Sequence, residues 1–379
     1  MGAANVTRTE RGHAALIVDI PNLRECYRRG PRPIAPEARL EKQWDAVRAQ
    51  LLSQVRQRAF DRVPSAERHL LSYSGRVSGQ GRRAAADGNV AESCRLFALA
   101  EHAVAGFKNL SEEMFFLCQT ERAAAEAYLD CYCGDYEQAG IRLRESYMAA
   151  QKLDEEFGYA AMRLQRMHLL NNVIRVEALA KNYHRGLCIG RDLLRHLCGD
   201  PGVSRDADLW GLEGVGAGFG DTSEIDDAIK VFLTSQTLHE VALLMAMIDH
   251  DTAQRHATRL FEDSVISRVS SMWPAPLRMW FDLKRCFLSG SAVEEVLAEG
   301  QDFLAGVNGS SSPLLWFTVA LDIAAVCESL PGGFGFEREV LAGPESQCVP
   351  RLVPISRLRV AERWVRHAAT GNGGLRQTA

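Results

Sequence analysis

The sequence predicts an all-α protein built from antiparallel helical hairpins stacked one after another. Its 379 residues are 46% hydrophobic and 24% charged, which is typical of a soluble globular chain. A turn motif recurs as Gly88-Asn89-Val90, Gly134-Asp135-Tyr136 and Lys181-Asn182-Tyr183. The middle residues of the three copies are 46 and 47 positions apart, and apolar stretches with helical spacing flank each copy. A fixed period of this size indicates stacked hairpins, which usually provide a binding surface.

Composition argues against a membrane or secreted protein. No apolar run approaches the roughly 18 residues needed to cross a bilayer, so we expect no membrane partner. Residues 1–12 are polar and lack the apolar segment of a secretory signal, so we expect a cytoplasmic protein. Most of the ten cysteines lie in apolar helical contexts, where we expect reduced, buried thiols. These are Cys94, Cys118, Cys188, Cys198, Cys286 and Cys327.

The charge is distributed unevenly along the chain. Residues 1–83 hold 16 basic and 8 acidic side chains, a net charge of +8. The remaining residues hold 28 basic and 40 acidic side chains, a net charge of −12. The basic part is suited to nucleic acid, to an acidic partner, or to the acidic remainder of the same molecule.

Residues 1–81 are predicted to form a basic N-terminal extension with capping helices. Residues 14–20 are the one stretch that predicts a strand, and Pro21 ends it. A connector rich in Pro and Arg follows at 28–36, where regular structure is not expected.

An amphipathic helix is predicted at residues 37–58, because apolar side chains recur there at helical spacing. We expect it to cap the first hairpin, as a helical stack requires. A short helix is predicted at 64–73, and the Ser- and Gly-rich residues 74–81 predict a hinge or a frayed helix.

The hairpins themselves are predicted over residues 82–213. On the second helix of each, small residues alternate with a larger residue one turn on, which lets two helices approach closely. These positions are Ser93, Phe97 and Ala100, then Ala139, Leu143 and Ser146, then Gly186, Gly190 and Leu193. A fourth candidate hairpin carries Ile225, Ala228, Phe232 and Ser235.

A second helical block is predicted over residues 221–330, and a C-terminal cap and tail over 336–379. Glycine-rich runs precede the two parts, at 214–220 and 331–335. The remaining predicted helices are 238–248, 252–269, 276–288, 292–306, 313–330 and 355–369.

The copy Gly134-Asp135-Tyr136, with Ala139 three positions on, resembles the turn signature of the tetratricopeptide repeat family. The copies at Gly88 and Lys181 resemble it more weakly. The family's repeat is about 34 residues long, so a period of 46–47 implies longer helices, similar to the sensor domains of bacterial regulators. The resemblance implies a right-handed α-solenoid whose concave face binds a peptide, with a separate N-terminal segment that carries the output.

Carried over from that resemblance, the concave-face positions lie on the first helix of each hairpin. They are Arg82, then Tyr128 and Tyr132, then His168, Asn171, Asn172 and Arg175. The adjacent Asn171 and Asn172 stand out, because Asn is a poor residue for a helix interior. Their amides could bind a peptide backbone. Alternatively, they hydrogen-bond a neighbouring helix or face water.

Other motifs give no convincing sign of chemistry. The glycine run 214–220 lacks the preceding strand of a dinucleotide site and the Gly-Lys-Ser/Thr ending of a phosphate loop. Cys131 and Cys133 point to different helix faces, and the Asp and His residues of 249–256 lack ligand spacing. Asp19 resembles the strand-end Asp of PIN-like nucleases, but the further carboxylates of their metal site are missing. We therefore expect no catalytic residue, cofactor or metal.

The function that the sequence favours is non-catalytic binding of a protein or peptide in the solenoid groove, as a scaffold or regulatory sensor. One alternative is a transcriptional-type regulator whose basic N-terminal part binds nucleic acid. A second alternative is a helical enzyme, or an enzyme subunit, whose site has no recognisable motif.

Overall fold

The structure, a computed structural model, describes residues 20–29, 57, 62–200, 227–248, 251–289, 291–306, 312–328, 330, 333 and 335–343. All regular elements in these residues are α-helices, so the prediction of an all-α protein is confirmed for the part described. Among these helices, none has both the length and the apolar composition needed to cross a membrane.

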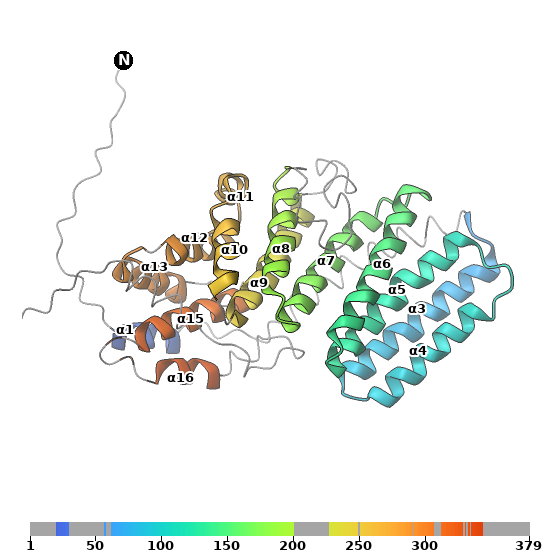
Figure 1. The fold of residues 1–379 in the computed structure, drawn as a ribbon, viewed down its shortest axis with the longest axis horizontal. Helices are drawn as coiled ribbons and strands as arrows, with labels where there is room; N and C mark the ends of the chain where they lie inside the picture. Colours follow the sequence, from blue (N-terminus) through green and yellow to red (C-terminus); the bar gives the residue numbers. More distant parts are fainter. Residues whose placement is uncertain are drawn as a thin grey trace, which may run out of the picture.

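The helices follow one another in a row, from α3 and α4 at one end to α12, α13 and α15 at the other (Figure 1). In chain order they are α1 (Ile20–Arg29), α3 (Ser65–Ala86), α4 (Val90–Ala105), α5 (Glu112–Cys133), α6 (Tyr136–Glu155), α7 (Met162–Leu179), α8 (Tyr183–Leu197), α9 (Asp227–Met247), α10 (Asp251–Phe261), α11 (Ser264–Ser270), α12 (Ala275–Ser289), α13 (Val293–Ala305), α15 (Pro313–Glu328) and α16 (Phe336–Ala342).

The recurring turn motif closes three hairpins with the same backbone geometry. Its first residue, Gly88, Gly134 or Lys181, has a left-handed φ of 79°, 82° or 64°. A residue in this conformation ends an α-helix and reverses the chain, and glycine adopts it without steric cost. The second helices, α4, α6 and α8, therefore begin 46 and 47 residues apart, as the motif does.

The second residue of the motif begins the following helix. Asn89 accepts a hydrogen bond from the backbone N–H of Glu92 (3.2 Å), and Asp135 accepts one from that of Gln138 (3.1 Å). These are the side-chain caps that satisfy free N–H groups at a helix start. Asn182 instead donates from Nδ2 to Glu177 (3.0 Å). The third copy of the turn motif thus departs from the other two at its first residue, which is Lys181 in place of glycine, and at its second, because Asn182 does not cap the helix.

Small side chains let the helices of this region approach closely, as predicted. Ser93 and Ser146 are fully buried, and their hydroxyls donate to the carbonyls of Gly81 (2.9 Å) and Thr120 (2.7 Å) on the first helix of their hairpins. A Cβ on Gly186 would lie 2.4 Å from Leu244 on α9. The glycine face of α8 therefore accommodates the next helix along the row as well as its own hairpin partner.

Two pairs of helices, α3 with α5 and α7 with α9, run parallel, each pair at its own nearly constant register. Between α3 and α5, a Cβ on Gly75 would meet Glu121, 46 positions on, and the hydroxyl of Ser111 bonds Glu67, 44 positions back. Between α7 and α9, two side-chain pairs are both separated by 65 positions. Contacts that keep the same separation along two helices require those helices to point the same way.

The expected hinge at residues 74–81 is wrong, because α3 runs unbroken from Ser65 to Ala86. Ser74, Ser78 and Gly81 are buried, and a Cβ on Gly81 would lie 2.8 Å from the Phe97 ring. The small residues therefore allow α4 and α5 to pack on α3. The predicted boundary between residues 81 and 82 falls inside this helix.

The expected strand at 14–20 is also wrong at its one described position, because Ile20 begins α1. Pro21 is tolerated in the first turn, where its missing N–H needs no partner. Arg28 and Arg29, expected in an irregular connector, end the same helix. Residues 14–19 lie outside the described part, as does the predicted helix 37–58 apart from Gln57.

The second block differs from its prediction in two places, and the C-terminal part in one. Residues 227–247 form the single helix α9, so no hairpin turn separates Ser235 from Leu238. The stretch 252–269 is divided at Asp263, whose carboxylate caps α11 by accepting from the N–H groups of Val265 (3.0 Å) and Ile266 (3.2 Å). The short helix α16 was not predicted. Residues 355–369 lie outside the described part.

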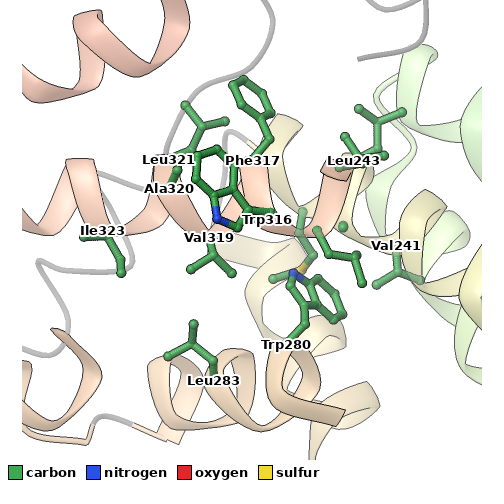
Figure 2. Packing of buried hydrophobic residues seen from close by; sticks show 14 of the residues in the cluster. Val241, Leu243, Trp280, Leu283, Trp316, Phe317, Val319, Ala320, Leu321 and Ile323 are labelled. Atoms are coloured by element: carbon green, nitrogen blue, oxygen red, sulfur yellow. The ribbon is translucent and has the colours of Figure 1, made fainter. Parts of the chain in front are cut away.

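A continuous hydrophobic core joins α1 and the helices from α7 to α16. Figure 2 shows its centre, where the fully buried Trp280 and Trp316 lie among aliphatic side chains. Each indole N–H has a partner, since Trp280 donates to the Thr318 hydroxyl (3.1 Å) and Trp316 donates to the Leu304 carbonyl (3.2 Å). These bonds remove the cost of burying a polar atom.

The cysteines are free thiols in the part of the chain that the structure describes. Cys118, Cys131, Cys188 and Cys327 are buried, in agreement with the expectation of core thiols. Cys94, which was expected in the core, is exposed. Burial raises the pKa of Cys118 and of Cys131 to about 12, so both remain protonated thiols at neutral pH.

Lys181→Gly should stabilise the protein by about 1 kcal/mol, because it relieves a side chain held in the left-handed region. Gly134→Lys should destabilise it by a similar amount. Urea unfolding of both variants measures the two effects. Lys108→Gly is the control, since Lys108 is an exposed turn residue without a positive φ. If Lys108→Gly raised the free energy of unfolding and Lys181→Gly did not, this account of the turn would be contradicted.

Acidification should destabilise the fold between about pH 6.5 and pH 4. Burial lowers the pKa of both His196 and His239 from 6.5 to about 4. The unfolded chain therefore takes up protons first as the pH falls, and each histidine contributes up to about 3 kcal/mol of stability above pH 6.5 that is lost towards pH 4. His239→Gln should flatten the pH dependence of the free energy of unfolding, whereas His69→Gln, at an exposed position, should not. Equal slopes in the two variants would refute this role of His239.

Candidate functional site

The candidate binding residues predicted on α3 and α5 lie near the turn that joins α3 to α4. Arg82 and Tyr128 are half-buried, and Tyr128 packs on a small cluster that contains Phe97 and Leu129. Tyr132, at the end of α5, is 46% exposed. Its hydroxyl lies over the α3–α4 turn, 2.9 Å from where a Cβ on Gly88 would be.

The candidate residues on α7 are joined by hydrogen bonds to α9. Asn171 donates from Nδ2 to Oε1 of Gln236 (3.1 Å), and Nε2 of Gln236 contacts Nδ1 of His168 (3.0 Å). Nε2 of His168 in turn lies 3.4 Å from the Asn172 amide. One glutamine of α9 therefore connects three predicted site residues of α7.

The His168 ring faces two amide nitrogens, Nε2 of Gln236 at Nδ1 (3.0 Å) and Nδ2 of Asn172 at Nε2 (3.4 Å). An amide nitrogen only donates, and a neutral imidazole accepts at one ring nitrogen only. With the shorter contact as the hydrogen bond, Nδ1 of His168 accepts from Gln236 and the ring proton lies on Nε2. A second hydrogen bond, from Nε2 to Asn172, then requires the Asn172 amide to be turned so that it presents its oxygen.

Arg175 forms the strongest contact of this interface. Its guanidinium pairs with both carboxylate oxygens of Glu240, with Nε donating at 3.0 Å and Nη2 at a closer approach. The Glu240 side chain is only 6% exposed, against 26% for Arg175. The positive charge of Arg175 also reaches Cys131 on α5, where it opposes the rise in pKa that burial causes. Arg175 therefore links α7 and α9.

The predicted residues form two groups, one on α3 and α5 and one at the contact of α7 with α9. Arg82 and Tyr128 are 46 positions apart, the same separation as Gly75 and Glu121. On α7, Arg175 lies opposite Glu240 of α9. We call Arg82, Tyr128, Tyr132, His168, Asn172, Arg175, Gln236 and Glu240 the first-helix row.

Asn171 differs from the rest of the predicted set, because it is only 1% exposed. Its amide nitrogen bonds Gln236, and its Oδ1 has no hydrogen-bond partner among the described residues. Asn171 thus follows the alternative of a bond to a neighbouring helix. Asn172 keeps partial exposure.

The sequence did not reveal Gln236 and Glu240 as members of this row. Both lie on α9, four positions apart, and they face Asn171 and Arg175, which are also four positions apart. Matching polar pairs with i, i+4 spacing on two helices are the one signal that could have identified them. Residues 236–240 were instead divided between two predicted helices.

No group of three or more His, Cys, Asp or Glu side chains is arranged to hold a metal ion within the described ranges. Cys131 is buried and Cys133 exposed, so the two thiols face different ways as expected. Sγ of the buried Cys188 lies 3.6 Å from Nδ1 of His256, which forms part of the contact between α8 and α10. The glycine run 214–220, Asp19 and residues 249–250 lie outside the described part.

Comparison with known proteins gives no match to a family model, to a curated protein or to a solved structure.

Removing one partner of the Arg175–Glu240 pair should be more costly than removing both. Arg175→Ala leaves the buried Glu240 carboxylate without its cation, so the free energy of unfolding should fall by about 2–3 kcal/mol. The double variant Arg175→Ala, Glu240→Ala should recover part of that loss. Urea unfolding of the wild type, the two single variants and the double variant measures the coupling free energy between Arg175 and Glu240.

The matched control is Arg95→Ala, which breaks an exposed arginine–glutamate pair on α4 and should leave stability unchanged. If the losses in the free energy of unfolding of Arg175→Ala and Glu240→Ala simply add in the double variant, α7 and α9 are held together by other contacts.

Proposed function

We propose that this protein is a non-catalytic α-solenoid of the tetratricopeptide-like kind, which binds a protein or peptide partner as a scaffold or regulatory sensor. The observation that carries the proposal is the parallel packing of two helix pairs, at 44–46 positions between α3 and α5 and at 65 positions between α7 and α9. Parallel first helices with antiparallel second helices between them are the arrangement of a helical-repeat stack.

The first-helix row is the proposed binding surface. It combines an exposed aromatic ring (Tyr132), half-buried Arg82 and Tyr128, and the amide of Asn172. Aromatic and arginine side chains contribute most to protein interfaces, and amides can pair with the backbone of an extended peptide. Asn171 is left out of this surface, because it is buried against α9.

Nucleic-acid binding by the basic N-terminal part has less support. Arg24, Arg28 and Arg62 belong to that part, and each bonds an acceptor inside the protein. The acceptors are the Gly333 carbonyl, the Glu339 carboxylate and the Phe157 carbonyl. Guanidinium N–H groups that are engaged in this way are less available to phosphate oxygens.

Selection of a displayed library of random peptides on the full-length protein tests the proposal. Enriched peptides, once synthesised, should bind the wild-type protein and lose at least about tenfold in affinity with Tyr132→Ala or Asn172→Ala. Met272→Ala, at another exposed apolar side chain between α11 and α12, should leave the affinity unchanged.

Circular dichroism should show the same helix content in all variants. The proposal fails if no peptide is enriched. It also fails if the enriched peptides bind the Tyr132 and Asn172 variants as tightly as the wild type.

A further inference from the structure

The N-terminal helix α1 has the pattern of a peptide ligand that binds as a helix. Ile20, Leu23 and Tyr27 are its buried side chains, at positions i, i+3 and i+7. The opposite side of the helix is exposed at Pro21 and at its arginine end. An amphipathic helix that inserts a few apolar anchors at this spacing into a complementary surface is a recurring mode of peptide recognition.

The surface beneath α1 has an aromatic site for the last of these anchors. The Tyr27 ring stacks on Trp316 of α15, with ring centroids 5.5 Å apart and an interplanar angle of 18°. Phe336 of α16 meets the same ring edge-on at 5.8 Å. Stacked and edge-on rings are favourable beyond the apolar area that they bury, so this position selects an aromatic residue.

Two arginines of α1 are recognised on the same surface. The Arg24 guanidinium lies 5.3 Å from the centre of the Phe336 ring and donates to the Gly333 carbonyl at 2.7 Å. Arg28 donates from Nε to Oε1 of Glu339 at 2.7 Å and from Nη2 to Oε2 at 3.2 Å. We call Trp316, Gly333, Phe336 and Glu339, together with the adjoining face of α13, the α1-docking surface.

These contacts are all made to residues far along the chain. Arg24 and Gly333 are 309 positions apart, and Arg28 and Glu339 are 311 positions apart. A helix of ten residues is not stable alone in water, so α1 is helical because it is docked. Its three anchors are buried in the core, so contacts with the docking surface hold it in place and its own helix propensity does not. Its docking is therefore an intramolecular binding equilibrium.

We propose that the α1-docking surface is a helix-recognition site, occupied in cis by α1, that exchanges α1 for a helix of a partner protein. The partner helix carries an apolar residue, a second one three positions on and an aromatic residue seven positions on, with arginines at the places of Arg24 and Arg28. This site is separate from the first-helix row, and the inference does not depend on peptide binding there.

A labelled peptide that spans residues 18–31, with Ser in place of Cys26, tests the exchange on the full-length chain. The variant Leu23→Asp, Tyr27→Asp should vacate the surface and bind this peptide at least about tenfold more tightly than the wild type, whose own α1 competes. A peptide with Tyr27→Ala should bind the variant at least about tenfold more weakly. Equal binding of the peptide to variant and wild type, or equal binding of both peptides, would overturn the proposal.

A charge exchange keeps the test valid if the double variant does not fold. Glu339→Arg weakens the docking of α1 and of the unaltered peptide alike, so binding of the unaltered peptide should change little, whereas a peptide with Arg28→Glu should bind this variant at least about tenfold more tightly than the wild type. Unchanged preference between the two peptides would overturn the proposal. So would a dimer of the wild-type chain in light scattering with α1 cross-linked to the other copy, because the exchange would then occur between copies of this protein.

Discussion

Reversal of the chain through one left-handed residue is the constraint on which the N-terminal half of this structure depends. At Gly88, Gly134 and Lys181 the backbone leaves the first helix of a hairpin, and the Asn or Asp that follows starts the second. The helices α3 and α5 are equal in length and each ends at such a turn. Residues at corresponding positions of the two helices, such as Gly75 and Glu121, therefore face each other. This register brings Arg82 of α3 to the level of Tyr128 of α5.

The turn positions could be predicted from sequence because they depend on local chemistry. A glycine with a positive φ and an Asn or Asp cap leave a signal within a few residues. The small residues at Ser93, Ser146 and Gly186 were also recognisable, although Gly186 meets α9 as well as its own hairpin. What could not be predicted depends on distant partners. The continuity of α3 requires Phe97 and Glu121, and the helical state of Ile20 requires a surface about 300 residues away.

The contact between α7 and α9 shows why polar residues lie in the middle of a helical stack. Apolar side chains would hold the two helices together equally well, but they would tolerate sliding by a turn. The hydrogen bond from Asn171 and the ion pair of Arg175 are satisfied at one offset only, and a shift would leave a buried carboxylate without its cation. Polar contacts here specify alignment more than they add stability.

The docking of α1 against α15 and α16 has a consequence for biosynthesis. The helix is translated before the other described helices, and Phe336 and Glu339, on which it rests, emerge about 300 residues later. At roughly 5–20 residues per second, α1 waits on the order of 15–60 s before its site exists. During that interval Ile20, Leu23 and Tyr27 lack their docking surface and lie on a segment of the nascent chain that is not yet helical, accessible to a chaperone or to any protein that binds the same pattern. The most N-terminal described helix is thus among the last to reach its native position.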